Sequence, residues 1–187
     1  MKFEDIAIRK VFKDKEHLCN QGCPVENLIK IVKGRCKTLR TEENGGMLML
    51  GYYNSSGYVG DLEFFTGEEL AFTTIIAVGE VESYSLPINK SREILRNDLD
   101  FIKELSFFLA KKFQESSLQN SENMLLSVEE RLLAYLKFSF PRLKVTEKLC
   151  DIAMLLGTSY RQLLRCVKIL VEKGYLEKRN GNYYLLK

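Results

Sequence analysis

The segment from Ser91 to about Ser121 constrains the fold more than any other part of this chain of 187 residues. It contains neither glycine nor proline, and its apolar residues recur at helical spacing with charged residues on the other face. We therefore predict one long amphipathic helix here. Because about ninety residues of a different character precede it, the chain is predicted to change from β-structure to helix at this point.

Short strands separated by turns are predicted for residues 1–90. The apolar stretches are short and rich in β-branched and aromatic residues, which is typical of strands. Many short strands at regular spacing predict a sandwich or barrel. The expected strands include Asn27–Val32, Met47–Tyr53 and Phe72–Val78, and the turn signals include Gln21-Gly22, Lys33-Gly34, Asn44-Gly45-Gly46 and Thr66-Gly67.

The apolar stripe of the long helix is richer than one surface of a β-domain requires. A second partner is expected to cover it, most simply the same helix of another subunit in a homodimer. The alternative is that the helix only covers its own β-domain. The residues expected at the dimer contact are Ile102, Leu105, Leu109 and Phe113.

The sequence after the long helix divides into a hinge and a second helical region. The polar segment Gln119–Ser127 is expected to be the hinge, and Ser127 followed by Glu130 matches a capping box at a helix start. We expect three parts: a β-domain at 1–90, the dimerisation helix at 91–121 and a DNA-binding domain at 122–187.

Residues 149–168 have the pattern of a helix-turn-helix. Ala153 is small where two helices would cross, and Gly157, four residues later, permits the sharp turn. Thr146 is expected to cap the first helix and Ser159 the second. The apolar anchors under the two helices are expected to be Ile152, Leu156, Leu163 and Cys166.

Polar and basic side chains mark the expected DNA-binding face. Arg and Gln can bond base edges bidentately, and the hairpin around Asn180-Gly181 resembles the wing of a winged helix, whose basic residues touch phosphate. Residues 140–187 hold ten Lys or Arg and four Asp or Glu, a net charge of +6, whereas the remaining 139 residues carry −3. The alternatives are a helical bundle with chance spacing and a solvated basic surface. The expected DNA-binding residues are Ser159, Tyr160, Arg161, Gln162, Arg165, Lys168, Lys178 and Arg179.

With these features in order, the chain resembles the Crp/Fnr family of bacterial transcription regulators over nearly its whole length. The matching stretches include GYVGDLEFF at 57–65, SVEERLLAYL at 127–136 and the segment LLGTSYRQLLRCVKILVEKGYL. The C-terminal end is most similar to the YeiL-type branch. The resemblance implies an α+β fold with an N-terminal jelly-roll-like β-roll, a dimerisation helix and a C-terminal winged helix-turn-helix. It also implies a double-stranded DNA operator and RNA polymerase as partners.

The resemblance places a small-effector pocket around Asp61, Leu62 and Glu63, with Ser116 and Ser117 on the long helix. Cyclic-nucleotide binders of the family carry an arginine for the ligand phosphate, whereas the matching place here falls at Glu69, or at its neighbours Leu70 and Ala71. No Lys or Arg occurs between Arg40 and Lys90, so a phosphate would meet carboxylates. We therefore expect regulation without cyclic nucleotides, and local turn contacts are the alternative role of Asp61 and Glu63.

The cysteines leave a further function open. Five cysteines fit no zinc pattern, but Cys19, Cys23 and Cys36 offer an alternative as a redox or small-ligand sensor. A single histidine and the lack of a nucleophile–base pair argue against an enzyme, and no cofactor or metal is expected. Without an apolar run of eighteen residues or a secretory leader, we expect a cytoplasmic protein with no membrane partner.

Overall fold

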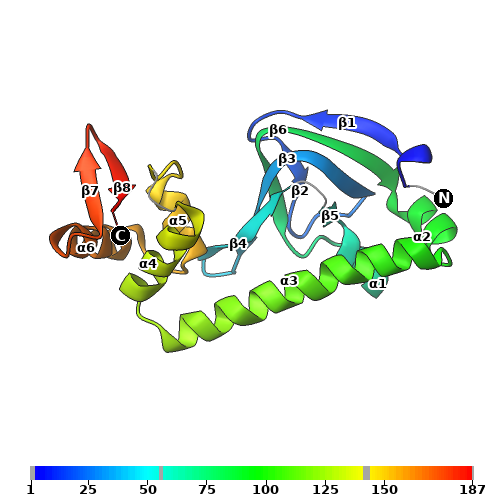
Figure 1. Ribbon diagram of the computed structural model, residues 1–187. Coiled ribbons are helices and arrows are strands. Elements are labelled where there is room, and N and C mark those ends of the chain that lie inside the picture. The colour runs from blue at the N-terminus through cyan, green and yellow to red at the C-terminus, as the bar shows by residue number, and fades with distance from the viewer. Residues whose placement is uncertain (1–2, 55–56, 141–143, 187) are drawn as a thin grey trace. The chain divides into compact units, whose positions relative to one another are not determined.

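The computed structural model describes residues 3–54, 57–140 and 144–186 (Figure 1). The chain forms two compact units, Met1–Ser116 and Ser117–Lys187. The first contains the β-structure and most of the long helix, and the second contains three helices and a hairpin.

The N-terminal unit is an antiparallel six-stranded β-roll. The main path through its sheet has the order β1-β6-β3-β4, while β2 pairs with β6 and β5 pairs with β3. Two short helical segments accompany the strands: a 3₁₀ turn at Phe3–Asp5 and α1 at Asp61–Thr66, which the sequence reading missed. The strands are β1 (Ile8–Phe12), β2 (His17–Cys19), β3 (Asn27–Thr41), β4 (Met47–Asn54), β5 (Tyr58–Val59) and β6 (Thr74–Pro87).

The predicted turn at Lys33-Gly34 is wrong. The two residues lie inside β3, where the register with β6 is irregular between Ile31 and Arg35. Gly34 has a φ of 102°, and a Cβ atom there would lie 2.5 Å from the carbonyl oxygen of Glu80. The glycine therefore permits a bulge and a close backbone approach within a continuous strand. By contrast, the turn at Asn44-Gly45-Gly46 does join β3 to β4.

The helix predicted from Ser91 to about Ser121 is two helices. Helix α2 (Ile88–Leu95) ends before Asp98, and α3 runs from Leu99 to Leu125. The Asp98 carboxylate accepts a hydrogen bond of 3.1 Å from the backbone amide of Phe101. Aspartate in this place satisfies an amide that a helix start leaves without a partner, so a new helix begins here without any glycine or proline.

One face of α3 completes the core of the N-terminal unit. Phe101 and Leu105 are buried on it, and the Tyr58 ring lies edge-on to Phe101 with the ring centroids 5.8 Å apart. Phe3 stacks on Phe101 from the other end of the sequence. The helix is therefore held to the β-roll by aromatic packing.

Most of the polar segment predicted as a hinge, Gln119–Ser127, is helical in the structure. Helix α3 continues through it to Leu125, and only then does the chain turn into the next helix. The Gln119 amide donates to the carbonyl oxygen of Leu155 at 2.9 Å, and Arg131 donates to that of Leu156 at 2.7 Å. The last turns of α3 are therefore fixed within the C-terminal unit by polar bonds that periodicity does not reveal.

The C-terminal unit has one apolar core shared by three helices and a hairpin. Helix α4 begins at the predicted capping box, where Ser127 and Glu130 exchange hydrogen bonds. The fully buried core includes Leu132, Ile152 and Leu163. The elements are α4 (Val128–Ser139), α5 (Leu149–Leu155), α6 (Tyr160–Glu172), β7 (Leu176–Arg179) and β8 (Asn182–Leu185). A β-roll, a long helix and a winged helix-turn-helix confirm the predicted α+β fold. Within the described ranges, no helix is long and apolar enough to cross a membrane.

Candidate nucleic-acid interface and cavity

Helices α5 and α6 form the helix-turn-helix that the spacing predicts. Ala153 is 3% exposed, and Gly157 takes a φ of 59° in the turn between the helices. All four predicted anchors are buried. A side chain larger than alanine at 153 would separate the helices, and a residue other than glycine at 157 would strain the turn.

The two helices begin differently from one another. Ser159 caps α6, as predicted, by accepting a hydrogen bond of 3.2 Å from the Gln162 amide. Thr146 does not cap α5: Lys148 holds that place and supplies no side-chain bond. Because α5 starts two residues later than the sequence suggested, Thr146 lies outside the capping position.

The outer face of α6 presents basic and polar side chains. Arg161 and Arg165 are exposed and four residues apart, so they project from the same side of the helix. Arg165 is 3.5 Å from the Gln162 side-chain oxygen. Tyr160 is half exposed at the N-terminus, and Lys168 lies 3.7 Å from Glu172 further along. This face offers guanidinium, amide and phenol groups to a partner.

The hairpin of β7 and β8 carries the other expected contacts. Asn180 and Gly181 both have positive φ at its tip, which is the conformation of a tight hairpin turn. Arg179 is paired with Glu177 at 2.5 Å, whereas the Lys178 ammonium lies over the Tyr183 ring, 5.6 Å from its centroid. Lys178 and Arg179 therefore differ in the charge they offer to a partner, because the charge of Arg179 is partly neutralised by Glu177 within the hairpin.

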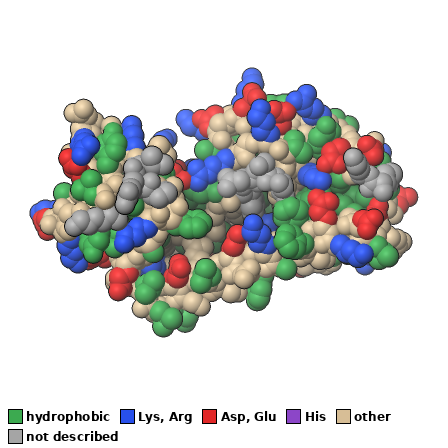
Figure 2. Space-filling model, viewed as in Figure 1, with side chains coloured by type: hydrophobic (Ala, Val, Ile, Leu, Met, Phe, Trp, Pro, Cys, Tyr) green, Lys and Arg blue, Asp and Glu red, His purple; other side chains and the backbone are tan. Residues whose placement is uncertain are grey.

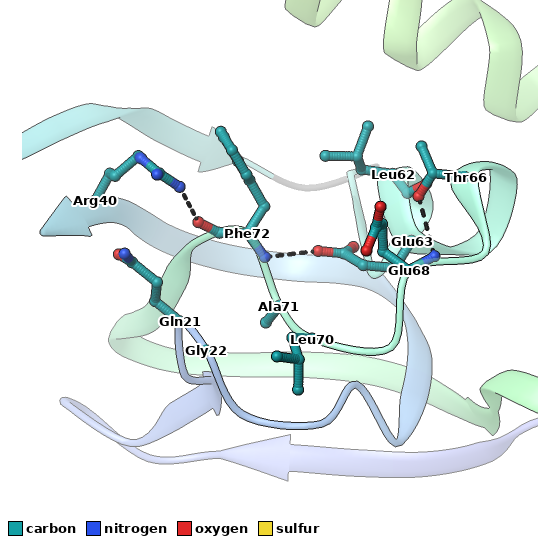
Figure 3. Close-up of a pocket in the computed structure, with 10 residues that line it drawn as sticks. All are labelled: Gln21, Gly22, Arg40, Leu62, Glu63, Thr66, Glu68, Leu70, Ala71 and Phe72. Carbon is teal, nitrogen blue, oxygen red and sulfur yellow. Dashed lines mark hydrogen bonds between the residues drawn. The ribbon is translucent and has the colours of Figure 1, made fainter. Parts of the chain in front are cut away.

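A cavity of about 340 Å³ opens in the N-terminal unit beside α1 (Figure 3). Arg40, from β3, donates to the Phe72 carbonyl oxygen at 2.9 Å, and the Glu63 carboxylate accepts from the Phe72 amide, also at 2.9 Å. Arg40 was not predicted to line the cavity, because it lies just before the stretch of sequence that lacks Lys and Arg. The lining residues are Gln21, Gly22, Arg40, Leu62, Glu63, Thr66, Glu68, Leu70, Ala71 and Phe72.

The structure separates the expected effector residues. Leu62 and Glu63 line the cavity. Asp61 does not, since its buried carboxylate forms an ion pair with Lys112 of α3. The same ammonium donates to the Tyr58 carbonyl oxygen at 3.2 Å. Ser116 and Ser117 lie exposed on α3 and are not among the lining residues.

The expected dimer residues follow one stripe of α3 but differ in burial. Leu105 is fully buried in its own unit, and Ile102 packs partly against the same core. Leu109 is half-buried, whereas Phe113 is 75% exposed. In the space-filling view apolar side chains reach the surface along α3 (Figure 2). The large exposed apolar residues of α3 are Leu99, Phe107, Phe113, Leu118, Met124 and Leu125.

The sequence is similar to a known domain family and to known regulatory proteins. Residues 9–98 match the model of the cyclic nucleotide-binding domain family. The chain is 24% identical to the regulatory protein YeiL of Escherichia coli O157:H7, over 93% of this chain and 79% of that protein. It is also 24% identical to the cAMP-activated global transcriptional regulator CRP of Salmonella typhimurium, over 88% of this chain and 83% of that one.

Solved structures agree along the whole chain. The c-di-GMP responsive global regulator CLP of Xanthomonas campestris superposes with a TM-score of 0.89 at 18% identity, covering 99% of this chain and 96% of that one. TTHA1359, a CRP/FNR-family transcriptional regulator of Thermus thermophilus, gives 0.78 at 19% identity, with coverage of 96% and 94%.

The resemblance to the Crp/Fnr family is confirmed. The match to the cyclic nucleotide-binding domain covers β1–β6 and α2, and the cavity lies inside the matched region. The helix-turn-helix lies beyond it, in the part that the whole-length relatives and structures cover.

The five cysteines differ in burial and in the pKa of their thiols. Cys36 is buried and Cys19 partly so, and burial raises the pKa of the Cys36 thiol to about 12 and that of Cys19 to about 11. Burial also raises the pKa of Cys166. Cys23 and Cys150 are exposed. Since thiolates are the reactive form, two of the three cysteines proposed for sensing are poorly suited to redox chemistry.

The differences in burial and thiol pKa predict which cysteines a thiol reagent labels. With an aromatic disulfide reagent at pH 8, Cys23 and Cys150 should react quickly, while Cys19, Cys36 and Cys166 should react only after denaturation. Raising the pH to 9 should expose no additional thiol, because the folded thiols of Cys19 and Cys36 stay neutral until about pH 11 or above. Mass spectrometry of the labelled peptides provides the measurement. Rapid labelling of Cys19 or Cys36 in the folded protein would contradict the assignment.

Proposed function

We propose that the protein is a dimeric transcription regulator that binds a specific, pseudo-palindromic sequence of double-stranded DNA. The observation that carries this proposal is the exposed pair Arg161 and Arg165 on the second helix of a winged helix-turn-helix. Two of the proteins named above, CRP and TTHA1359, are transcriptional regulators, which supports the same conclusion. Such a protein acts in the cytoplasm, and RNA polymerase is its expected further partner.

The DNA contacts divide between base reading and phosphate binding. Helix α6 enters the major groove with its N-terminal residues toward the bases, so Tyr160, Arg161 and Arg165 read the sequence. Arginine bonds guanine O6 and N7 bidentately. Lys178 in the hairpin binds phosphate, which adds affinity without sequence preference. Ser159 is assigned mainly to capping α6, since its hydroxyl already accepts from Gln162.

The second subunit is proposed to pack on the outward face of α3. Leu105 belongs to the core of its own unit, so it does not serve the contact as first expected. Leu99, Phe113 and Met124 are exposed, and their spacing along α3 is made of seven- and four-residue steps, which keep them on one face of the helix. Six large apolar side chains left exposed along one helix are unusual for a monomer.

Regulation is proposed to be independent of cAMP, although the chain matches the cyclic nucleotide-binding family. The carboxylate available for a ribose hydroxyl, Asp61, is already engaged by Lys112. Leu70 and Ala71 stand near the place where cyclic-nucleotide binders carry their phosphate-binding arginine. A nucleotide would have to break a buried ion pair and would gain no guanidinium there.

A redox or small-ligand sensor without specific DNA binding is the competing function. The cavity beside α1 favours a ligand, and the raised thiol pKa values disfavour a redox role for the cysteines. Gel shifts with and without reductant separate these possibilities. Loss of DNA binding on oxidation, reversed by reductant, would favour the cysteine sensor.

The outward face of α3 predicts the effect of a charge at Phe113. Phe113→Lys should raise the dimer dissociation constant about tenfold or more, because it removes apolar burial and places an unpaired ammonium at the contact. Phe138→Lys on α4, at a phenylalanine that is even more exposed, is the matched control and should leave the dimer intact. Analytical ultracentrifugation gives both values. A wild-type chain that stays monomeric at micromolar concentration would refute the proposed assembly.

The state of Asp61 predicts a negative result with cAMP. Calorimetric titration of the full chain should show no saturable heat at micromolar cAMP. Titration of a cAMP-activated relative under the same conditions confirms that the ligand is competent. Saturable binding in the micromolar range would contradict the proposal.

Substitutions in α6 and in the hairpin distinguish base reading from phosphate binding. After selection of bound sites from random duplexes, Arg161→Ala should relax the preference at one position in each half-site, by about 1–3 kcal/mol. Lys178→Ala should weaken all sequences alike and reduce the salt slope by about one. Arg179→Ala is the control for charge removal and should change the slope less, because Glu177 already pairs with Arg179.

Affinities for single-base operator variants at several salt concentrations provide the test. If Arg161→Ala lowers the affinity for every variant equally and the preference pattern stays intact, Arg161 is a phosphate contact and the orientation of α6 is wrong.

A further inference from the structure

We infer that the cavity beside α1 binds a small zwitterion, a free α-amino acid with an apolar side chain, between Arg40 and Glu63. The inference deepens the proposed function, because it names the class of effector for that regulator. Binding itself is independent of DNA, so the two ideas can be tested separately.

The size and apolar walls of the cavity suit a small molecule. Its volume of about 340 Å³ lies near the lower end of the range of ligand pockets, which begins at about 300 Å³. Leu62, Leu70 and Phe72 line it and are 39%, 54% and 49% exposed. Large apolar side chains left this open gain stability when an apolar group covers them.

Glu63 supplies a site for an ammonium group. The residue is 6% exposed, and among the described residues its carboxylate accepts one hydrogen bond, from the Phe72 amide. Among the described residues, no Lys or Arg side chain forms an ion pair with it. A carboxylate that is buried without a cation carries a desolvation cost that a bound ammonium would offset. Figure 3 draws the Glu68 carboxylate close to it, on the side of the cavity away from Arg40.

Arg40 supplies a site for a carboxylate. Its Nη1 donates to the Phe72 carbonyl oxygen at 2.9 Å, and its Nε donates to Glu42 at 3.0 Å. The guanidinium also lies 4.2 Å from the centroid of the Phe72 ring, which fixes its plane at the cavity. A guanidinium has five donors in a rigid fork, so donors remain for a carboxylate after these two bonds.

The spacing of the two charges favours a molecule that carries both. Glu63 accepts from the amide of Phe72, and Arg40 donates to the carbonyl of the same residue. The carboxylate and the guanidinium are thus set apart by the backbone of one amino acid. A free amino acid carries its ammonium and carboxylate across the same span. An amine alone would leave the remaining donors of Arg40 without a carboxylate, and a carboxylic acid alone would meet Glu63 and Glu68.

Calorimetric titration of the full chain without DNA tests the inference with three probes. Leucine carries both charges, isoamylamine lacks the carboxylate, and isocaproate lacks the ammonium. Leucine should bind saturably, and each analogue should bind at least about tenfold more weakly, because each loses one charge-assisted pair.

Two isosteric variants connect binding to the named residues. Glu63→Gln keeps an oxygen to accept from the Phe72 amide and removes only the charge, and Arg40→Met keeps an unbranched apolar stem and removes the guanidinium. Each should weaken leucine binding about tenfold or more. Glu69→Gln and Arg35→Met are matched controls outside the cavity lining and should bind leucine as the wild type does. Circular dichroism verifies that each variant is folded.

Every outcome decides the inference. No saturable heat with leucine, equal affinity for leucine and isoamylamine, or unchanged binding in folded Glu63→Gln would each overturn it. A gel shift with and without leucine keeps the proposed function separate. DNA binding without any effect of leucine would retain the regulator and reject this effector, whereas no DNA binding in either condition would reject the regulator while the calorimetry stands.

Discussion

The buried ion pair between Lys112 and Asp61 sets how the long helix lies on the β-roll. A buried carboxylate is costly without a partner, and removing one member of such a pair typically destabilises a protein by about 3–5 kcal/mol. Lys112 meets this need and also donates to the carbonyl oxygen of Tyr58, at the strand that precedes Asp61. A single ammonium thus joins α3 to β5 and to the start of α1, and the aromatic contacts of Tyr58 and Phe101 fill the space beside it.

Because of this attachment, one face of α3 packs within the subunit and another stays exposed. The inner face, with Phe101 and Leu105, is used within the subunit, and its burial leaves nothing for a partner to cover. The outward face carries Leu99, Phe113 and Met124 among small residues, which is the surface a second helix can approach closely. The same attachment also removes Asp61 from ligand binding. The cavity beside α1 is lined instead by Glu63, Glu68 and Arg40.

Local patterns in the sequence predicted the C-terminal unit well. The spacing of Ala153 and Gly157 and the capping box at Ser127 depend on residues a few positions apart, so sequence alone contains the information. The break before Asp98 was missed because aspartate both tolerates a helix and caps one, and only the hydrogen bond to Phe101 decides between them. Helical periodicity showed that α3 is amphipathic but not which apolar residues face inward, so Leu105 was assigned to a partner.

The cavity could not be predicted from the sequence. Arg40 and Glu63 are far apart in the chain, and their relation depends on the backbone of a third residue, Phe72. The sequence between Arg40 and Lys90 is acidic and has no Lys or Arg. The guanidinium that lines the same cavity belongs to Arg40, the residue just before this stretch. Strand pairing brings it there, since β3 lies between β4 and β6.

The wall of this cavity is also the place where α2 is anchored. Arg92 of α2 donates to the backbone carbonyl oxygen of Glu63 at 2.7 Å, and it lies 3.5 Å from that of Glu68. Glu63 therefore faces the cavity with its side chain and α2 with its backbone. Only Arg96, Asn97 and Asp98 separate α2 from α3, so a ligand that moves Glu63 acts on the residues that position the long helix. Coupling between two sites requires an element that both of them bias, and the bond from Arg92 to the Glu63 backbone makes α2 the element through which the proposed ligand would act.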